Sequence, residues 1–279
     1  MRELERETTI DTNSPTSAST EGSAAPRALG RIAIVGRGRL GSALAAALGR
    51  VGADVVGPLG HDESVEAEAA LLCVPDAAIA HAARSAAAWA PLIGHTSGAT
   101  PLAMIAESTG ADCFGLHPLQ TFAGDDADAD RFRGCAAAIA GTSAAALEFA
   151  EGLARRLDMD PIRIDERHRA GYHAAASIAS NFLIVLEDAA ETVAERAGLD
   201  RAAARAALAP LVRASVENWA ELGPERALTG PVARGDEATI AAQRSAIERS
   251  APELLELFDS LLERGRSLAA RATPLGRAA

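Results

Sequence analysis

The sequence predicts an α/β domain followed by an all-α domain. Between residue 31 and about residue 165, short apolar runs that end in Gly, Pro or Ser alternate with helical patterns, as in a doubly wound parallel sheet. Beyond that point only helical periodicity remains. We therefore expect a disordered leader rich in Ser, Thr and Pro at 1–28, an α/β domain at 29–165 and a helical domain at 166–279.

The first elements follow from apolar runs and their punctuation. An apolar run that ends in glycines is expected to form a buried parallel strand, and Leu40 to Arg50 has the apolar spacing of a helix. Another helix is expected at 77–89. The predicted strands are 32–35, 54–56, 69–74, 92–95, 113–116, 136–140 and 162–164.

The C-terminal third is expected to contain three helical stretches. They cover 167–198, about 201–222 with a kink at Pro210, and about 236–272. The segment 228–236 is interpreted as a loop, with Asp236 as the N-cap of the last helix.

Composition excludes several classes of function. The net charge of −11 disfavours nucleic acid as a partner, because binding phosphates needs a basic surface. No apolar stretch is long enough for a membrane span, and the N-terminal residues do not resemble a secretory signal. The three cysteines lack zinc-site spacing, so we expect no metal and free thiols in the cytoplasm.

A glycine-rich motif directly follows the first predicted strand and opens the first helix. Its sequence is Gly36-Arg37-Gly38-Arg39-Leu40-Gly41, a G-x-G-x-x-G. In this context the first glycine permits a tight turn, the second a close approach to a pyrophosphate, and the third close packing of helix on strand. The motif predicts a Rossmann domain that binds a dinucleotide.

NADP is the cofactor we expect, with NAD or deazaflavin F420 as alternatives. NAD sites usually carry an acid at the end of the second strand, and the run ending in Gly57-Pro58 has none there. Arg37 and Arg39, inside the glycine loop, are the candidates to bind a 2′-phosphate. Further cofactor contacts are expected where later strands end, at Val74, Pro75, Asp76, Thr96 and Ser97.

Two polar groups are candidates for the chemistry. His117 and Gln120 lie in a predicted strand-end loop and could face a substrate. In the helical domain, His173, Ser177 and Asn181 are spaced i, i+4, i+8 and should share one helix face. We interpret His173 as a proton donor, Ser177 and Asn181 as orienting groups, and Arg234 as a carboxylate ligand.

These residues together resemble a known family. The glycine loop, Cys73-Val74-Pro75-Asp76, His95-Thr96-Ser97-Gly98, Leu116-His117-Pro118-Leu119, the helix with His173 and the segment 228–236 are similar to a bacterial family that joins a Rossmann-like domain to a helical domain of unknown function. Its wider group is 6-phosphogluconate dehydrogenase C-terminal-like and includes ketopantoate, pyrroline-carboxylate and F420-dependent NADP reductases. The resemblance implies an NADP-type cofactor, a cytoplasmic location and homodimers formed through the helical domain.

The chain departs from part of this group because all 27 of its basic residues are arginine. Ketopantoate reductases use a catalytic lysine on the helix that opens the second domain, where this chain has His173. The leading hypothesis is an NADP-dependent oxidoreductase that reduces a small 2-oxo acid, such as ketopantoate. The alternatives are an imine or deazaflavin-linked NADP reductase, and a non-catalytic module that senses dinucleotides.

Overall fold

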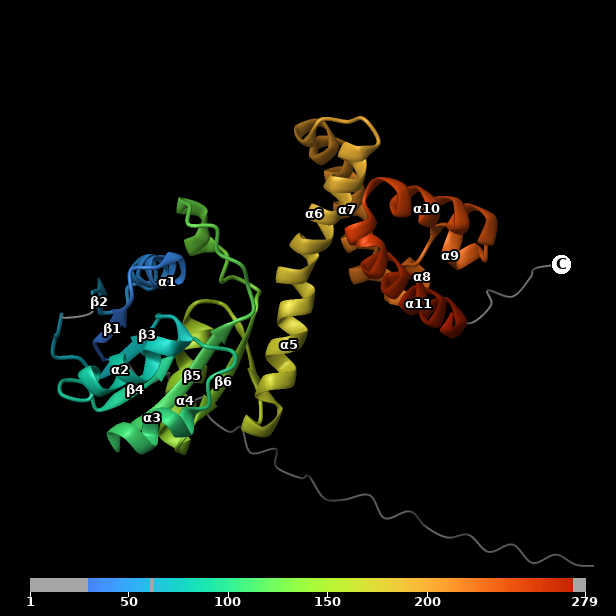
Figure 1. Cartoon of the computed structure of the whole chain (residues 1–279). Helices are drawn as coiled ribbons and strands as arrows, with labels where there is room; N and C mark the ends of the chain where they lie inside the picture. The colour runs from blue at the N-terminus through green and yellow to red at the C-terminus, as the bar shows by residue number, and fades with distance from the viewer. Residues whose placement is uncertain (1–29, 61–62, 273–279) are drawn as a thin grey trace, which may run out of the picture. The chain divides into compact units, whose positions relative to one another are not determined.

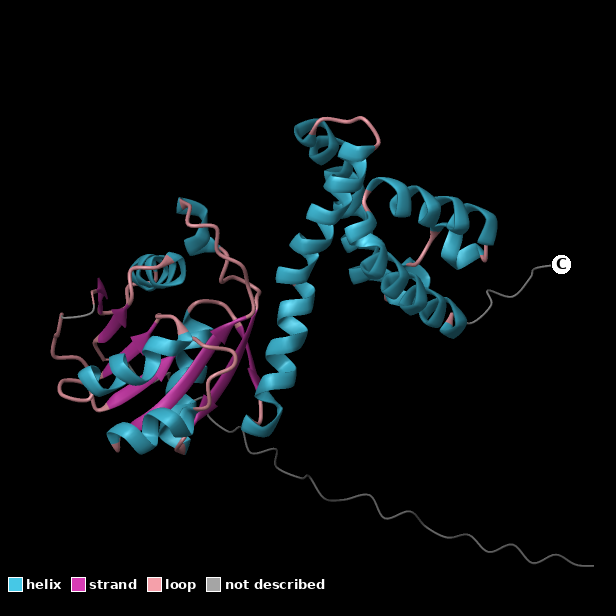
Figure 2. Cartoon of the chain, viewed as in Figure 1, coloured by secondary structure: helices cyan, strands magenta, loops and turns pink. Residues whose placement is uncertain are grey.

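The protein divides into two compact units in a computed structural model that describes residues 30–60 and 63–272. One unit ends at Arg169 and the other begins at Ala170. Figure 1 colours the chain by residue number, and Figure 2 shows that the strands, drawn in magenta, all lie in the first unit. The leader expected at 1–28 lies outside the described residues.

The first unit is built on a seven-stranded sheet in the order β2-β1-β3-β4-β5-β6-β7. The α/β fold with a helical C-terminal part is therefore confirmed. The strands are β1 Ile32–Val35, β2 Val55–Leu59, β3 Ala69–Leu72, β4 Leu92–His95, β5 Asp112–Pro118, β6 Ala136–Gly141 and β7 Asp160–Arg163.

The sheet is not fully parallel, which corrects the sequence prediction. Strand β6 pairs antiparallel with β5, while all other neighbours are parallel. The physical reason is the connection between β5 and β6. Residues 119–135 contain only the short 3-10 helix η1 (Asp126–Asp130) and no crossover helix, which a parallel pair of strands would need.

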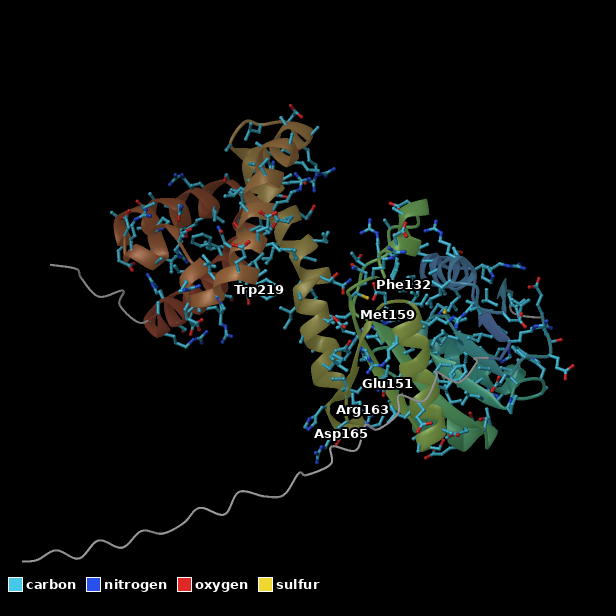
Figure 3. The ribbon with its side chains drawn as sticks, turned by 180° about the vertical axis from the view of Figure 1, so that it is seen from behind. Phe132, Glu151, Met159, Arg163, Asp165 and Trp219 are labelled. Carbon is cyan, nitrogen blue, oxygen red and sulfur yellow. The ribbon has the colours of Figure 1, made fainter. Side chains whose placement is uncertain are left out.

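Four helices cover the sheet: α1 Arg39–Arg50, α2 Asp76–Ala86, α3 Leu102–Thr109 and α4 Ala144–Arg156. The sequence analysis did not assign α3 or α4. Helices α1 and α4 pack with Phe114 and Leu116 in one apolar cluster, and α2 and α3 pack with Ile93 in the other. Both faces are therefore buried, as continuous apolar strands require. At the far edge Arg163 of β7 pairs with Glu151 of α4 at 3.1 Å (Figure 3).

The second unit is helical. Its elements are α5 Arg169–Ala179, α6 Asn181–Arg196, α7 Arg201–Leu222, α8 Pro224–Ala227, α9 Gly230–Arg234, α10 Glu237–Ser250, η3 Pro252–Leu254 and α11 Leu255–Arg271, with the first unit's last turn, η2 Glu166–His168, leading into α5. Helix α7 continues through Pro210.

Three helical expectations need correction. The stretch 167–198 is divided at Ser180, whose φ of −118° departs from the value of about −63° in an α-helix. The stretch 236–272 is interrupted at Ala251 and Pro252, since Pro cannot donate the amide bond that would continue α10. The segment 228–236 contains the short helix α9, closed by Gly235 at φ +68°. The N-cap at Asp236 is confirmed, because its carboxylate accepts from the Thr239 amide at 3.1 Å.

Among the described helices, none is long and apolar enough to cross a lipid bilayer.

Candidate cofactor site

The glycine loop has the geometry that a dinucleotide requires. Gly36 has φ +116°, and a Cβ there would lie 2.2 Å from the Cys73 carbonyl oxygen. A Cβ on Gly41 would lie 2.0 Å from the Gly36 carbonyl oxygen, so only glycine lets α1 pack this closely on β1. A Cβ on Gly38 would meet nothing within 4 Å, so this stretch of backbone faces open space.

The N-terminus of α1 is suited to an anion. Gly38 is its N-cap and provides no capping side chain, and no acidic residue lies in its first turn. The first amides and the positive end of the helix dipole are therefore not compensated by the helix's own side chains. A phosphate is the group that such an N-terminus commonly binds. The residues of the loop thus fit a dinucleotide pyrophosphate.

Arg37 reaches from the glycine loop to the exit of β2. Its Nε donates to the Pro58 carbonyl oxygen at 3.4 Å, and its Nη2 lies 2.6 Å from Oε1 of Glu63. The Glu63 Oε2 in turn accepts from the Gly60 amide at 2.8 Å. Arg39, also exposed, directs the stem of its side chain towards Gly124, so the two arginines diverge.

The end of β2 differs from the sequence interpretation. The strand extends through Pro58 to Leu59, and an acid, Glu63, folds back to its tip. The sequence analysis placed no acid there because Glu63 lies four residues beyond the strand. Both oxygens of this acid are hydrogen bonded, and those bonds to the Gly60 amide and to Arg37 hold the pKa of Glu63 below its usual value.

The next strands end at the same edge of the sheet as the glycine loop, because β1, β3 and β4 are parallel. After β3, Val74 is half-buried, while Pro75 and Asp76 are exposed at the start of α2. These positions therefore stand beside the glycine loop, which agrees with their predicted place at the carboxyl edge.

The loop after β4 is held by hydrogen bonds within it and by one to the end of β3. The Thr96 hydroxyl donates to the Leu72 carbonyl oxygen at 3.4 Å and is buried. The Ser97 Oγ accepts from the Thr100 amide at 2.9 Å and donates to the Thr100 hydroxyl at 3.0 Å. These hydroxyls therefore hold the loop in shape. The sequence analysis interpreted Thr96 and Ser97 as cofactor contacts and did not include these bonds within the protein.

The sequence analysis did not assign a role to the two residues that hold the loop after β4 in place, His95 and Arg169. His95 is fully buried and its Nδ1 accepts from the Ser97 amide at 3.1 Å. Its Nε2 has no hydrogen-bond partner within residues 30–60 and 63–272. Burial, and secondarily the positive charge of Arg169, lowers the pKa of His95 to about 4, so the ring is neutral at pH 7.

Arg169 is the second missed residue. It is almost fully buried, and its Nη1 donates to the Ser97 carbonyl oxygen at 3.0 Å. Its Nη2 pairs with Glu166 at 3.0 Å, and the other Glu166 oxygen accepts from the Leu102 amide at the start of α3. A Cβ on Gly115 would lie 3.1 Å from the Arg169 guanidinium. The sequence contains a local signal only for the pair with Glu166, which precedes Arg169 by three residues. The contacts of Arg169 with Ser97 and Gly115 join segments that are distant in the sequence, so no local pattern predicts them.

The β5 candidates do not share one loop as predicted. His117 lies inside the strand, opposite Ala138 of β6, and is half-buried. Gln120 follows in the exposed loop, where its Nε2 donates to the Arg131 carbonyl oxygen at 3.3 Å and its Oε1 accepts from the Thr121 amide. The correction follows from β6, whose antiparallel pairing extends β5 through Pro118.

The candidates of the helical unit are distributed over three helices. His173 and Ser177 are half-buried on α5, whereas Asn181 is exposed as the first residue of α6. Asn181 therefore belongs to a different helix from His173 and Ser177. Arg234 is exposed at the end of α9, and its positive charge contributes to the lowered pKa of Asp236, after the bonds from Thr239.

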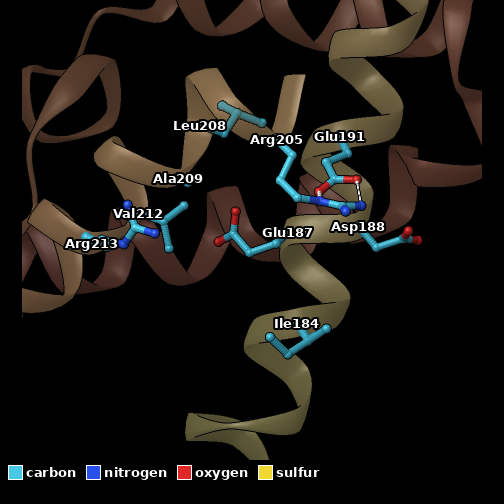
Figure 4. Close-up of a pocket in the computed structure, with 9 residues that line it drawn as sticks. All are labelled: Ile184, Glu187, Asp188, Glu191, Arg205, Leu208, Ala209, Val212 and Arg213. Carbon is cyan, nitrogen blue, oxygen red and sulfur yellow. Dashed lines mark hydrogen bonds and ion pairs between the residues drawn. The ribbon is translucent and has the colours of Figure 1, made fainter. Parts of the chain in front are cut away.

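The helical unit has its own groove of about 390 Å³ between α6 and α7 (Figure 4). Glu191 and Arg205 form a bidentate pair at its side, with distances of 2.6 and 2.8 Å. None of the predicted site residues lines this groove; the lining residues are Ile184, Glu187, Asp188, Glu191, Arg205, Leu208, Ala209, Val212 and Arg213. Across the described part of the chain, no group of three His, Cys, Asp or Glu side chains is arranged to hold a metal.

Residues 135–264 match the family of domains of unknown function DUF2520. The match covers the end of the α/β unit and most of the helical unit. The expected combination of a Rossmann-type domain with a helical domain of unknown function is therefore confirmed. No curated protein matches the chain.

Solved structures share the fold over most of the chain. A provisionally named NADP oxidoreductase from Bacteroides fragilis, BF3122, aligns with a TM-score of 0.71 and 21% identity, covering 86% of this chain and 98% of that one. A protein from Thermotoga maritima aligns at 0.67 with 21% identity and the same coverage. A pyrroline carboxylate reductase from Plasmodium falciparum, solved with NADP bound, aligns at 0.55 with 9% identity, covering 86% and 98%. At these identities the likeness establishes the fold.

Proposed function

We propose that this protein is an NADP-dependent oxidoreductase that transfers hydride to a small substrate. The observation that carries the proposal is the glycine loop, in which Gly36 and Gly41 leave no room for a Cβ while Gly38 faces open space. Arg37, at the exit of β2, supplies the positive charge that a 2′-phosphate needs. Similarity in fold to a protein named as an NADP oxidoreductase and to a reductase solved with NADP agrees with it.

In this proposal the chain's residues bind and orient, while the cofactor supplies the hydride. The amides at the start of α1 hold the pyrophosphate, and Arg37 binds the 2′-phosphate. Arg169 and His95 keep the loop at Ser97 in one conformation, since they bond to its carbonyl and amide groups. A fixed loop at the carboxyl edge of β4 favours one orientation of whatever binds there.

His173 is the proposed proton donor to the substrate oxygen, with Ser177 and Asn181 orienting the substrate. His173 follows Arg169 by four residues, about one turn of α5, and Arg169 is anchored to the loop after β4. Arg234, His117 and Gln120 are the proposed ligands of a substrate carboxylate, which makes a small 2-oxo acid such as ketopantoate the first substrate class to test.

An imine is the second candidate substrate class. The chain has no lysine, the residue that ketopantoate reductases use on the corresponding helix. Among the structures of similar fold is a reductase of pyrroline carboxylate, which is a cyclic imine. A deazaflavin-linked NADP reductase and a dinucleotide sensor without turnover are the remaining alternatives.

A homodimer in the cytoplasm is the proposed assembly and location. Large apolar side chains of α5, α6 and α7 are exposed, including Phe182 at 56% and Trp219 at 56%. A second copy is the simplest partner for such a surface, because most oligomers pair identical surfaces about a two-fold axis. Free thiols at Cys73, Cys113 and Cys135 agree with a reducing compartment.

The test of the cofactor is a fluorescence titration with NADPH and NADH. We expect Gly38→Asp to abolish NADPH binding, since it places a negative charge where the pyrophosphate would bind, although a Cβ there meets nothing in the protein. Gly38→Ala is the matched control for folding. If Gly38→Asp binds NADPH as well as the unchanged protein, the glycine loop is not the cofactor site.

The test of the chemistry is turnover of NADPH with 2-oxo acids, cyclic imines and F420. His173→Ala is expected to lower kcat by about 10²-fold or more while NADPH affinity changes little, as removal of a general acid does. Unchanged kcat on an accepted substrate would remove His173 from the mechanism. Tight NADPH binding without turnover of any substrate would favour the sensor.

A further inference from the structure

An acid outside the glycine loop pairs with the guanidinium that the proposed function assigns to the 2′-phosphate. Arg37 Nη2 lies 2.6 Å from Glu63 Oε1, and Glu63 Oε2 accepts from the Gly60 amide at 2.8 Å. The acid is thus fixed by backbone at the tip of β2 and presents its charge to Arg37. None of the sequence motifs includes Glu63.

The tip of β2 is where Rossmann domains distinguish the two cofactors. A carboxylate there accepts a hydrogen bond from the ribose 2′-hydroxyl of NAD, whereas an arginine binds the 2′-phosphate of NADP. This chain carries one group of each kind, and the two are bonded to one another. Each group therefore competes with the ligand of the other.

The ion pair between Arg37 and Glu63 can open so that each side chain binds the cofactor instead. The side chains of Arg37 and Glu63 are 62% and 48% exposed, and ion pairs at such exposure contribute little stability. Arg37 has further N–H groups beyond those bonded to Pro58 and Glu63, since a guanidinium has five. A 2′-phosphate can approach these groups, but it meets the Glu63 charge within a few ångströms.

We propose that Glu63 sets the choice between NADP and NAD, by competing with the 2′-phosphate for Arg37 and by accepting the 2′-hydroxyl when no phosphate is present. The inference rests on the proposed function, since it concerns the same cofactor site. According to this inference the protein binds both NADP and NAD. Its preference for NADP is smaller than it would be with Arg37 and without Glu63.

Calorimetric titration of the full chain with adenosine 2′,5′-bisphosphate and with ADP-ribose tests the inference. Glu63→Gln keeps the size and an acceptor oxygen but removes the charge. It is expected to tighten the bisphosphate about tenfold and to leave ADP-ribose equal or weaker, so that the ratio of the two affinities rises. Arg37→Gln is expected to lower the same ratio at least tenfold.

Glu66→Gln is the matched control, because it removes an equal charge from an exposed carboxylate three residues further on. Its bisphosphate affinity should stay within about twofold of the unchanged protein, which separates a local effect from net charge. Thermal unfolding of each variant reports whether the fold is retained.

The outcomes separate this inference from the function on which it rests. If the unchanged protein binds the bisphosphate and Glu63→Gln binds it equally or more weakly, the inference is overturned and the cofactor site remains. If the unchanged protein binds neither nucleotide and no NADPH, the proposed function fails and the inference fails with it. A rise in the affinity ratio for Glu63→Gln but not for Glu66→Gln supports the role of Glu63.

Discussion

The two units of this protein treat their apolar side chains in opposite ways. The α/β unit buries Phe114 and Phe132 on one face of its sheet and Ile79 and Ile93 on the other, all almost completely. In the described residues of the helical unit, the buried apolar side chains are only Ala204, Ile240, Ile247 and Ala251. A unit of this length normally buries most of its apolar surface. The difference teaches that the α/β unit contains its own core, whereas the described helices of the second unit leave most of their large apolar side chains incompletely buried.

The exposed side chains support this conclusion. Trp219 of α7 is labelled in Figure 3 and is more than half exposed. The α5 to α7 segment also exposes Ile178, Phe182, Ile184, Val185, Leu199, Leu211, Val216 and Leu222. Fully burying one such side chain stabilises by about 1.5–3 kcal/mol, so a partner that covers several of them would contribute substantially.

The largest expected effect is on assembly. Phe182→Glu combined with Trp219→Glu should weaken the proposed homodimer at least about 100-fold, because charges replace two central apolar contacts. Sedimentation velocity across a concentration series measures this change. Val51→Glu with Met104→Glu is the matched control, since these apolar side chains are exposed on the α/β unit. A monomeric unchanged protein would refute the homodimer.

An intermediate effect is expected inside the α/β unit, at His95. Its pKa is lowered to about 4 in the folded protein, so protonation favours the unfolded chain. The stabilisation is present above about pH 6.5 and is lost as the pH falls towards 4, which amounts to about 2 kcal/mol between pH 7 and pH 5. Urea unfolding at the two pH values should show this loss.

His95→Asn is the variant that tests this assignment. The amide oxygen can accept from the Ser97 amide in place of Nδ1, but the side chain does not titrate. We expect its stability difference between pH 7 and pH 5 to shrink by about 2 kcal/mol relative to the unchanged protein. An undiminished difference in His95→Asn would contradict the assignment.

The smallest effect is expected for surface ion pairs of the α/β unit. Arg31 and Asp54 lie 3.2 Å apart with side chains more than half exposed. Arg31→Gln should lower the free energy of unfolding by less than about 1 kcal/mol. A larger loss in urea unfolding would show that the stability of this unit depends on more than its apolar core.

Local patterns predicted much of the α/β unit. The glycine loop, the buried strand β1 and helix α1 follow from residue types at fixed spacing, and the structure has them at nearly the predicted residues. The apolar pattern failed to predict where β5 ends, because strand pairing sets that end. Strand β5 continues through His117 and Pro118 since β6 pairs antiparallel beside it. The pattern also failed at Ser180, where the helix expected at 167–198 divides into α5 and α6.

The sequence by itself determined the class of the fold and the position of the dinucleotide loop, because glycine requirements and apolar periodicity are local properties. Only the tertiary structure decided which distant groups meet. It brought Glu63 and Gly60 to Arg37, and Arg169 and Glu166 to Ser97 and the start of α3. Such contacts join residues that are separated by up to 72 positions, and their formation depends on the packing of strands and loops, which no short pattern records.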